Sequence, residues 1–237
     1  MPLHDHFHPP LRLRRAWSSF HSAWATFLAA DLNHRLPPRY FAEPLVQFAI
    51  EIDVASWDEL SGPTREEPLP LGAWLPAAPQ RTLPLVPVTD SIEVRIFRHE
   101  GGPVLAGAIE LVSPANKDRP DTRDAFVSKC ANYLRQGVGV VVVDVVTERH
   151  AELHRELLER IAPGETTAVE ADLYAAAYRP VRRGEQTNVE IWHEPLTLGG
   201  TLPTMPLWLR GGICLPVELE ATYELTLREL RVPTNGA

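Results

Sequence analysis

The stretch that decides the fold reads Asp90-Ser-Ile-Glu-Val-Arg-Ile-Phe97, then Val104-Leu-Ala-Gly-Ala-Ile-Glu-Leu-Val112, and ends in Val138-Gly-Val-Val-Val-Val-Asp-Val-Val146. The first two segments flank a glycine pair and predict two strands joined as a hairpin. The third is apolar on both faces, which is typical of a central strand. A helix with Phe126, Cys130, Tyr133 and Leu134 on its buried face is expected between them. These segments predict an α/β core with carboxylates and lysines where its strands end.

Length and composition fit a single domain. The chain has 237 residues, of which 44% are hydrophobic and 23% charged, as in globular proteins. We expect one α/β domain over residues 1–237, with a mixed central sheet flanked by helices. The net charge of −8 disfavours a sequence-independent grip on nucleic-acid phosphates. A nuclease of this composition would need a local basic patch or metal ions.

The N-terminus and the cysteines carry weaker signals. No basic start leads into an apolar core and no run approaches membrane-span length, so we expect a cytoplasmic protein outside the membrane. Cys130 and Cys214 are predicted to be small buried hydrophobic residues. His4, His6 and His8 alternate, a spacing open to metal binding, but a frayed terminus is favoured because no element fixes their geometry.

Elements before the deciding stretch are a helix, a strand and an insertion. Residues 11–36 keep helical spacing up to Pro37, and His21 beside the aromatic stripe is predicted to be a core or hydrogen-bonded histidine. Residues 46–54 alternate as a half-covered strand. Residues 57–88 form a proline-rich insertion, which excludes regular helix and central strand. This insertion is predicted to dock on the surface or on a protein partner.

Elements after the deciding stretch add to the core. A helix is expected over residues 150–161, and a hairpin from residues 173–181 and 188–194. Residues 201–212 look like a proline-broken apolar loop. Pro216 is predicted to begin a last helix.

Two glutamates fall on one face of the first predicted hairpin. If Gly101 and Gly102 form a two-residue turn, Glu93 lies directly opposite Glu110. A longer loop places Ser91 opposite Glu110 and leaves Glu93 diagonal to it. In both registers the two carboxylates share a face.

Like charges across a strand pair destabilise it unless something compensates them. Either a metal cation or proton does so, or Arg95 and Lys129 neutralise the carboxylates structurally; both explanations stay open. Lys129 lies one helical turn before Tyr133, at the edge of the buried stripe, so its ammonium can reach the sheet. Asp144 would be costly to bury unpaired, and a backbone amide or an arginine is its expected partner.

The predicted order α-β-β-β-α-β, with acids on the hairpin, resembles the core of the PD-(D/E)XK, or restriction-endonuclease-like, superfamily. A C-terminal hairpin and helix would extend that core. The string from Ala108 to Lys117, the Tyr133 to Val138 segment and the strand ending in Asp144 resemble the bacterial family called domain of unknown function 4058. The segment from Phe20 to Tyr40 resembles the N-terminal helix and turn of that family.

The superfamily resemblance implies a set of site residues. Glu110 matches the metal-binding acid of the third strand, and Glu93, or in second place Asp90, that of the second strand. The motif lysine is missing, because Val112 stands two residues after Glu110. Lys129 on the following helix is the first replacement and Lys117 the second.

The resemblance implies hydrolysis of phosphodiester bonds with Mg²⁺ or Mn²⁺. Nucleic acid is then the partner, either DNA or RNA, and Arg119 and Arg123 would supply basic contacts near the mouth of the site. The alternative is a catalytically inactive binding module on the same fold, with residues 57–88 binding a protein partner. A homodimer is compatible with either function. A cupin-like or other metal hydrolase is disfavoured because no His-x-His string falls inside the predicted core.

Overall fold

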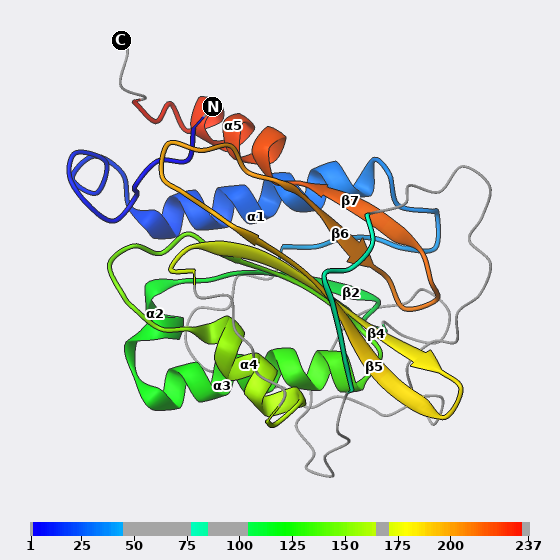
Figure 1. Ribbon diagram of the computed structural model, residues 1–237. Helices are drawn as coiled ribbons and strands as arrows, with labels where there is room; N and C mark the ends of the chain where they lie inside the picture. Colours follow the sequence, from blue (N-terminus) through cyan, green and yellow to red (C-terminus); the bar gives the residue numbers. More distant parts are fainter. Residues whose placement is uncertain (1, 45–76, 85–103, 165–170, 234–237) are drawn as a thin grey trace.

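The computed structural model describes residues 2–44, 77–84, 104–164 and 171–233 (Figure 1). The predicted strands over residues 46–54 and 90–97, and with them Glu93 and Asp90, lie outside this part of the chain. So does most of the insertion over residues 57–88.

A mixed five-stranded sheet forms the centre of the molecule, in the order β1-β5-β4-β3-β2. β2 and β3 are parallel, and the other neighbouring pairs are antiparallel. The strands are β1 (Arg81–Pro84), β2 (Gly107–Leu111), β3 (Gly139–Asp144), β4 (Tyr174–Arg183) and β5 (Gln186–Pro195). The predicted mixed sheet is therefore confirmed, as are β3 as a fully buried strand and the β4–β5 hairpin.

Helices α2 (Pro114–Asp118) and α3 (Pro120–Arg135) connect the two parallel strands. Pro120 stands in the first turn of α3, where its missing N–H costs no hydrogen bond. Gly137 follows the helix with φ of 78°, a left-handed conformation that favours glycine, and turns the chain into β3. The predicted buried stripe is confirmed in Phe126, Cys130, Tyr133 and Leu134.

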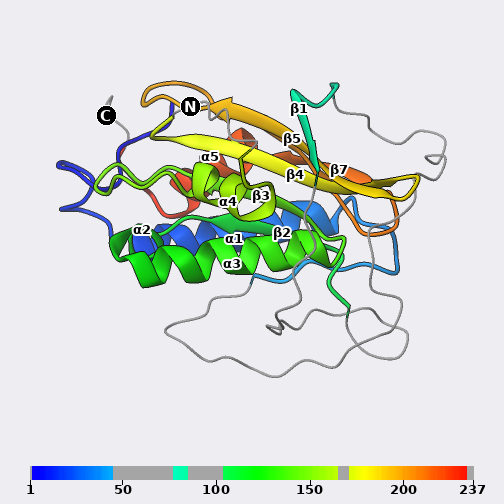
Figure 2. The same cartoon turned by 60° about the horizontal axis from the view of Figure 1, so that its bottom comes forward.

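Two layers cover the sheet, one on each face (Figures 1 and 2). α3 and α4 (Leu153–Ile161) lie on one face, which we call the α3 face, and pack against Val140 and Val142 of β3. On the opposite face, Val141 and Val143 meet α1 (Trp17–Asn33), α5 (Leu219–Glu229) and a ribbon of β6 (Thr204–Trp208) and β7 (Cys214–Glu218). Successive valines of β3 thus point to opposite faces, and both faces are covered, which explains why the strand is apolar up to Val143.

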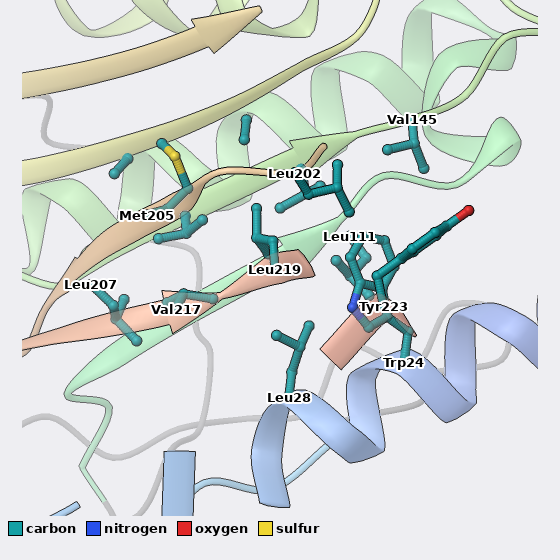
Figure 3. Packing of buried hydrophobic residues seen from close by; sticks show 14 of the residues in the cluster. Trp24, Leu28, Leu111, Val145, Leu202, Met205, Leu207, Val217, Leu219 and Tyr223 are labelled. Atoms are coloured by element: carbon teal, nitrogen blue, oxygen red, sulfur yellow. The ribbon is translucent and has the colours of Figure 1, made fainter. Parts of the chain in front are cut away.

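In the layer formed by α1, α5 and the β6–β7 ribbon, the core is built around an aromatic contact between α1 and α5. Trp24 of α1 meets Tyr223 of α5 edge-on, with ring centroids 5.3 Å apart. Figure 3 shows Leu28 of α1 and Leu219 beside them, facing Leu111 of β2. The end of β2 is therefore held by packing on this face.

The predictions for the C-terminal region were wrong in two places. Residues 204–208 form strand β6 rather than loop, and Pro216 lies inside β7 rather than at the start of a helix. Pro206 stands opposite Pro216 in the ribbon. A pair that exchanges no hydrogen bonds needs neither N–H, so two facing prolines are tolerated in an antiparallel ribbon.

The prediction of a frayed N-terminus was also wrong. Leu3, Phe7 and Leu11 are buried, and Leu3 exchanges two backbone hydrogen bonds with Gly199 and Gly200, at 2.9 and 2.8 Å. The ring of His6 is buried with its Nε2 2.7 Å from the Tyr223 hydroxyl. Packing against α5, which local sequence does not reveal, fixes this segment.

Three smaller predictions can be compared with the structure. Cys130 and Cys214 are both buried, as predicted. Within the insertion, Arg81 to Pro84 form β1, which ends the sheet order of the described strands, where proline is tolerated. In the residues covered by the description, no helix is both long and apolar enough to span a membrane.

Candidate active site at the ends of two parallel strands

Glu110 and Lys129 form an ion pair on the α3 face. Glu110 shares this face with Ala108 of β2 and with Val112 just after the strand, which pack against the buried residues of α3. Lys129 comes from α3, and its Nζ lies 2.8 Å from Glu110 Oε2. The Lys129 side chain is 37% exposed and that of Glu110 16%, so solvent reaches the pair from the lysine side. The prediction that Lys129 reaches the acid on β2 is confirmed.

The charge of Glu110 acts on its surroundings. Burial lowers the pKa of Lys129, but attraction to Glu110 and the hydrogen bond between them outweigh it and raise that pKa overall. Burial, with Glu110 adding to it, raises the pKa of Tyr133 and of Cys130. At neutral pH the ammonium of Lys129 therefore stays charged, and the Tyr133 hydroxyl and the Cys130 thiol stay neutral.

A second lysine–carboxylate pair lies at the adjacent strand end. Lys117 Nζ is 2.9 Å from Asp144 Oδ2, and both side chains are buried, at 1% and 0% exposure. Val146 closes the arrangement, because its N–H donates to Asp144 Oδ1 at 3.0 Å and its carbonyl accepts from Lys117 at 3.3 Å. The expected backbone amide partner of Asp144 is confirmed, but its cation is lysine rather than arginine.

This burial decides the role of Lys117. Its ammonium binds Asp144 and Val146 and is shielded from solvent, so it contacts Asp144 instead of Glu110. Lys117 was the second candidate for the catalytic lysine, and a side chain that cannot meet substrate does not suit that role. The structure assigns it to holding α2 against the end of β3.

The lysines of this chain are confined to the two pairs. Only two of its 23 basic residues are lysines, Lys117 and Lys129, and the rest are arginines. Lysine offers a compact ammonium with three donors, whereas arginine offers a planar fork that favours bidentate pairs. Sequence reasoning did not use this scarcity, which would have singled out both positions.

Asp144 makes a pH-dependent contribution to stability. Burial raises its pKa to about 6, against the opposing effect of Lys117. Because this folded-state pKa lies above the unfolded value of 3.8, the contribution of Asp144 is fully present below pH 3.8 and is lost as pH rises through about 6. We expect the free energy of unfolding of the wild type, relative to Asp144→Asn, to decline over this window. Urea unfolding of both proteins from pH 4 to 7.5 measures it, and a pH-independent difference would contradict it.

His21 holds the main chain next to Glu110. Its Nε2 lies 3.0 Å from the carbonyl oxygen of Leu111, the residue after Glu110. Its ring stacks on Trp17, with centroids 5.5 Å apart and planes 12° from parallel. The prediction of a core or hydrogen-bonded histidine is confirmed.

The arginines predicted to serve the mouth of the site are paired with acids. Arg119 lies 3.8 Å from Asp118, and Arg123 lies 3.2 Å from Glu156. An open groove of about 700 Å³ between α3 and α4 has both signs of charge in its lining, which includes Arg123, Arg155, Arg160, Asp121, Asp124, Glu156 and Glu159. Such a lining is not a basic patch for phosphates.

At the two strand ends, Glu110 is the carboxylate that a metal ion can reach. Glu110 is partly accessible, whereas Asp144 is buried against Lys117. The predicted partners Glu93 and Asp90 lie outside the described residues. Among those that are described, no group of three or more His, Cys, Asp and Glu side chains is placed to hold a metal, the N-terminal histidines included.

A buried cluster of histidine and tyrosine was missed by sequence reasoning. His154 Nδ1 lies 2.5 Å from the Tyr178 hydroxyl, and the His154 and His193 rings are 4.5 Å apart. Burial lowers the pKa of His154 to about 3, so the ring is neutral. The three residues come from α4, β4 and β5, and no local pattern predicts that they meet.

No protein-family model, curated protein or solved structure was found to match this chain.

Proposed function

We propose that the protein is a divalent-metal-dependent hydrolase of phosphodiester bonds with a restriction-endonuclease-like core. The ion pair of Glu110 and Lys129 carries this proposal. It joins an acid on one of two parallel strands to a lysine on the helix that connects them. The resemblance to the domain of unknown function 4058 family belongs to the same proposal.

Three features support a catalytic over a structural pair. The Lys129 side chain is 37% exposed, which is more than a structural ion pair requires. Of the two lysines in the chain, Lys117 is buried in its pair with Asp144, so Lys129 is the one that is exposed. The parallel β2–α3–β3 crossover brings acid and lysine together on one face of the sheet.

The roles of the residues follow from their charges. Glu110, with Glu93 or Asp90, would hold Mg²⁺ or Mn²⁺ through carboxylate oxygens, and the ion would supply an acidified water and charge stabilisation. Lys129 donates hydrogen bonds to the attacking water or to a phosphate oxygen. Because the raised pKa of Lys129 keeps it protonated, it acts as an electrostatic donor rather than as a base.

Cleavage assays test this function. Purified full-length protein is incubated with single-stranded DNA, double-stranded DNA or RNA in Mg²⁺, Mn²⁺ or EDTA. We expect metal-dependent cleavage that falls by about 100-fold or more in Glu110→Gln and Lys129→Met. Lys129→Arg keeps the charge and is expected to fall as well, because the guanidinium cannot replace a compact ammonium.

Asp121→Asn is the matched control for Glu110→Gln, because Asp121 lies exposed in the first turn of α3. Cleavage at the wild-type rate in Glu110→Gln, or cleavage that survives EDTA, would overturn the proposal.

A binding module without catalysis is the second candidate. Val112, at the position of the missing motif lysine, is fully buried, and Arg119 and Arg123 are paired with acids. These features weaken both the catalytic and the phosphate-binding parts of the first proposal. Melting temperatures distinguish the two candidate functions. If the protein is a nuclease, a divalent ion should raise the melting temperature of the wild type but not that of Glu110→Gln. If the protein shows no cleavage and no metal-dependent rise in melting temperature, the binding module is favoured.

A further inference from the structure

The hydrogen bond between His21 and the Leu111 carbonyl holds the main chain at the end of β2, next to Glu110. The N–H of Val112 points toward β3, because it donates to the Val143 carbonyl at 2.9 Å. The Leu111 carbonyl belongs to the same trans peptide group as this N–H, and the two point in opposite directions, so the Leu111 carbonyl points away from β3. His21 approaches from that side and donates through Nε2, since a carbonyl oxygen only accepts.

The end of β2 is therefore held from both sides. On one side Val112 is bound to β3, and on the other the Leu111 carbonyl is bound to α1 through His21. Among the described strands, β2 lies at the edge of the sheet, so β3 flanks it on one side and no described strand flanks it on the other. Without His21, the peptide group that joins Leu111 to Val112 would lose a lateral restraint.

The His21 ring is itself fixed. It stacks on Trp17, one helical turn earlier, which contacts the rings of Phe7 and Phe20. Burial lowers the pKa of His21 against the raising effects of its bond to Leu111 and of the Glu110 charge. The neutral ring then carries its proton on Nε2, where the bond to Leu111 requires it.

We propose that His21 is a positioning residue of the Glu110 site: its hydrogen bond to the Leu111 carbonyl fixes the strand end from which Glu110 meets Lys129. His21 acts through the main chain, by its hydrogen bond to the Leu111 carbonyl. This inference rests on the proposed hydrolase function.

Two substitutions separate the hydrogen bond from the packing. His21→Phe keeps an aromatic ring against Trp17 but removes the donor, and His21→Gln offers an amide N–H near the position of Nε2. His34→Phe is the control, because His34 is exposed at the end of the same helix. We expect His21→Phe to lower kcat by about tenfold with KM changed less than twofold, since small displacements of a catalytic group cost rate rather than binding.

His21→Gln is expected to restore kcat to within about threefold of the wild type, and His34→Phe to leave it unchanged. A purely structural role would lower the melting temperature without this split between kcat and KM. Wild-type kcat in His21→Phe, or equal losses in His21→Phe and His21→Gln, would overturn the positioning role and leave the hydrolase intact. A wild-type protein with neither cleavage nor a rise in melting temperature with Mn²⁺ would overturn both.

Discussion

Lys117→Met is expected to lower the free energy of unfolding by about 3–5 kcal/mol at pH 8, the usual cost of removing one member of a buried ion pair. The Lys117 and Asp144 side chains are 1% and 0% exposed, so water cannot replace the lost ammonium. Methionine has a similar length and no charge, so packing changes little. Urea unfolding monitored by tryptophan fluorescence measures the loss.

Two comparisons show whether the lost charge is the cause. In Lys117→Met/Asp144→Leu both charges are absent, and most of the lost stability should return. The penalty of Lys117→Met alone should shrink toward pH 5, because Asp144, with a pKa of about 6 even beside lysine, then takes up a proton. Lys129→Met is the matched control, and its cost should be much smaller because Lys129 is partly solvated. Equal losses in the two lysine variants would contradict a special role for burial.

Gly139→Ala is expected to cost about 3 kcal/mol, near the upper end of the range for overpacked cores. A Cβ at position 139 would lie 2.1 Å from the carbonyl oxygen of Trp208 and 3.1 Å from its carbonyl carbon. Both are backbone atoms at the end of β6, which crosses β3 there. The ribbon would have to move away from the sheet, and the melting temperature should fall by roughly 6–12 °C.

Gly107→Ala is the matched control, because Gly107 is the cross-strand partner of Gly139. A Cβ there would lie 2.7 Å from Leu209 Cδ2, at the end of a flexible side chain that can rotate away. Its cost should be well below that of Gly139→Ala. Equal melting temperatures for the two variants would contradict the close approach of β6 to β3.

Sequence patterns over a few neighbouring residues predicted the helices and strands whose formation depends mainly on those residues. The continuous apolar run of β3, the alternation of the β4–β5 hairpin and the helical spacing around Phe126 each fix an element regardless of its partners. The position of Lys129 on the edge of its helix was predictable for the same reason, because helical projection sets direction. The contact with Glu110 then follows from the crossover between parallel strands.

Long-range packing decided what the sequence could not reveal. The facing prolines Pro206 and Pro216 look like breakers until they are seen paired in a ribbon. Lys117 looks as available for catalysis as Lys129, and only the burial of Asp144 beside it separates the two. The N-terminal histidines were treated as frayed because Tyr223, the partner of His6, lies on the last helix.

The contact between His6 and Tyr223 also affects when the protein can finish folding. The two residues are 217 positions apart in the chain. At ribosomal rates of about 5–20 residues per second, His6 is made roughly 10–40 s before Tyr223. During synthesis Leu3 and Leu11 must therefore remain without the α5 residues of their native core. The N-terminal segment can therefore reach its native packing only after α5 has been synthesised.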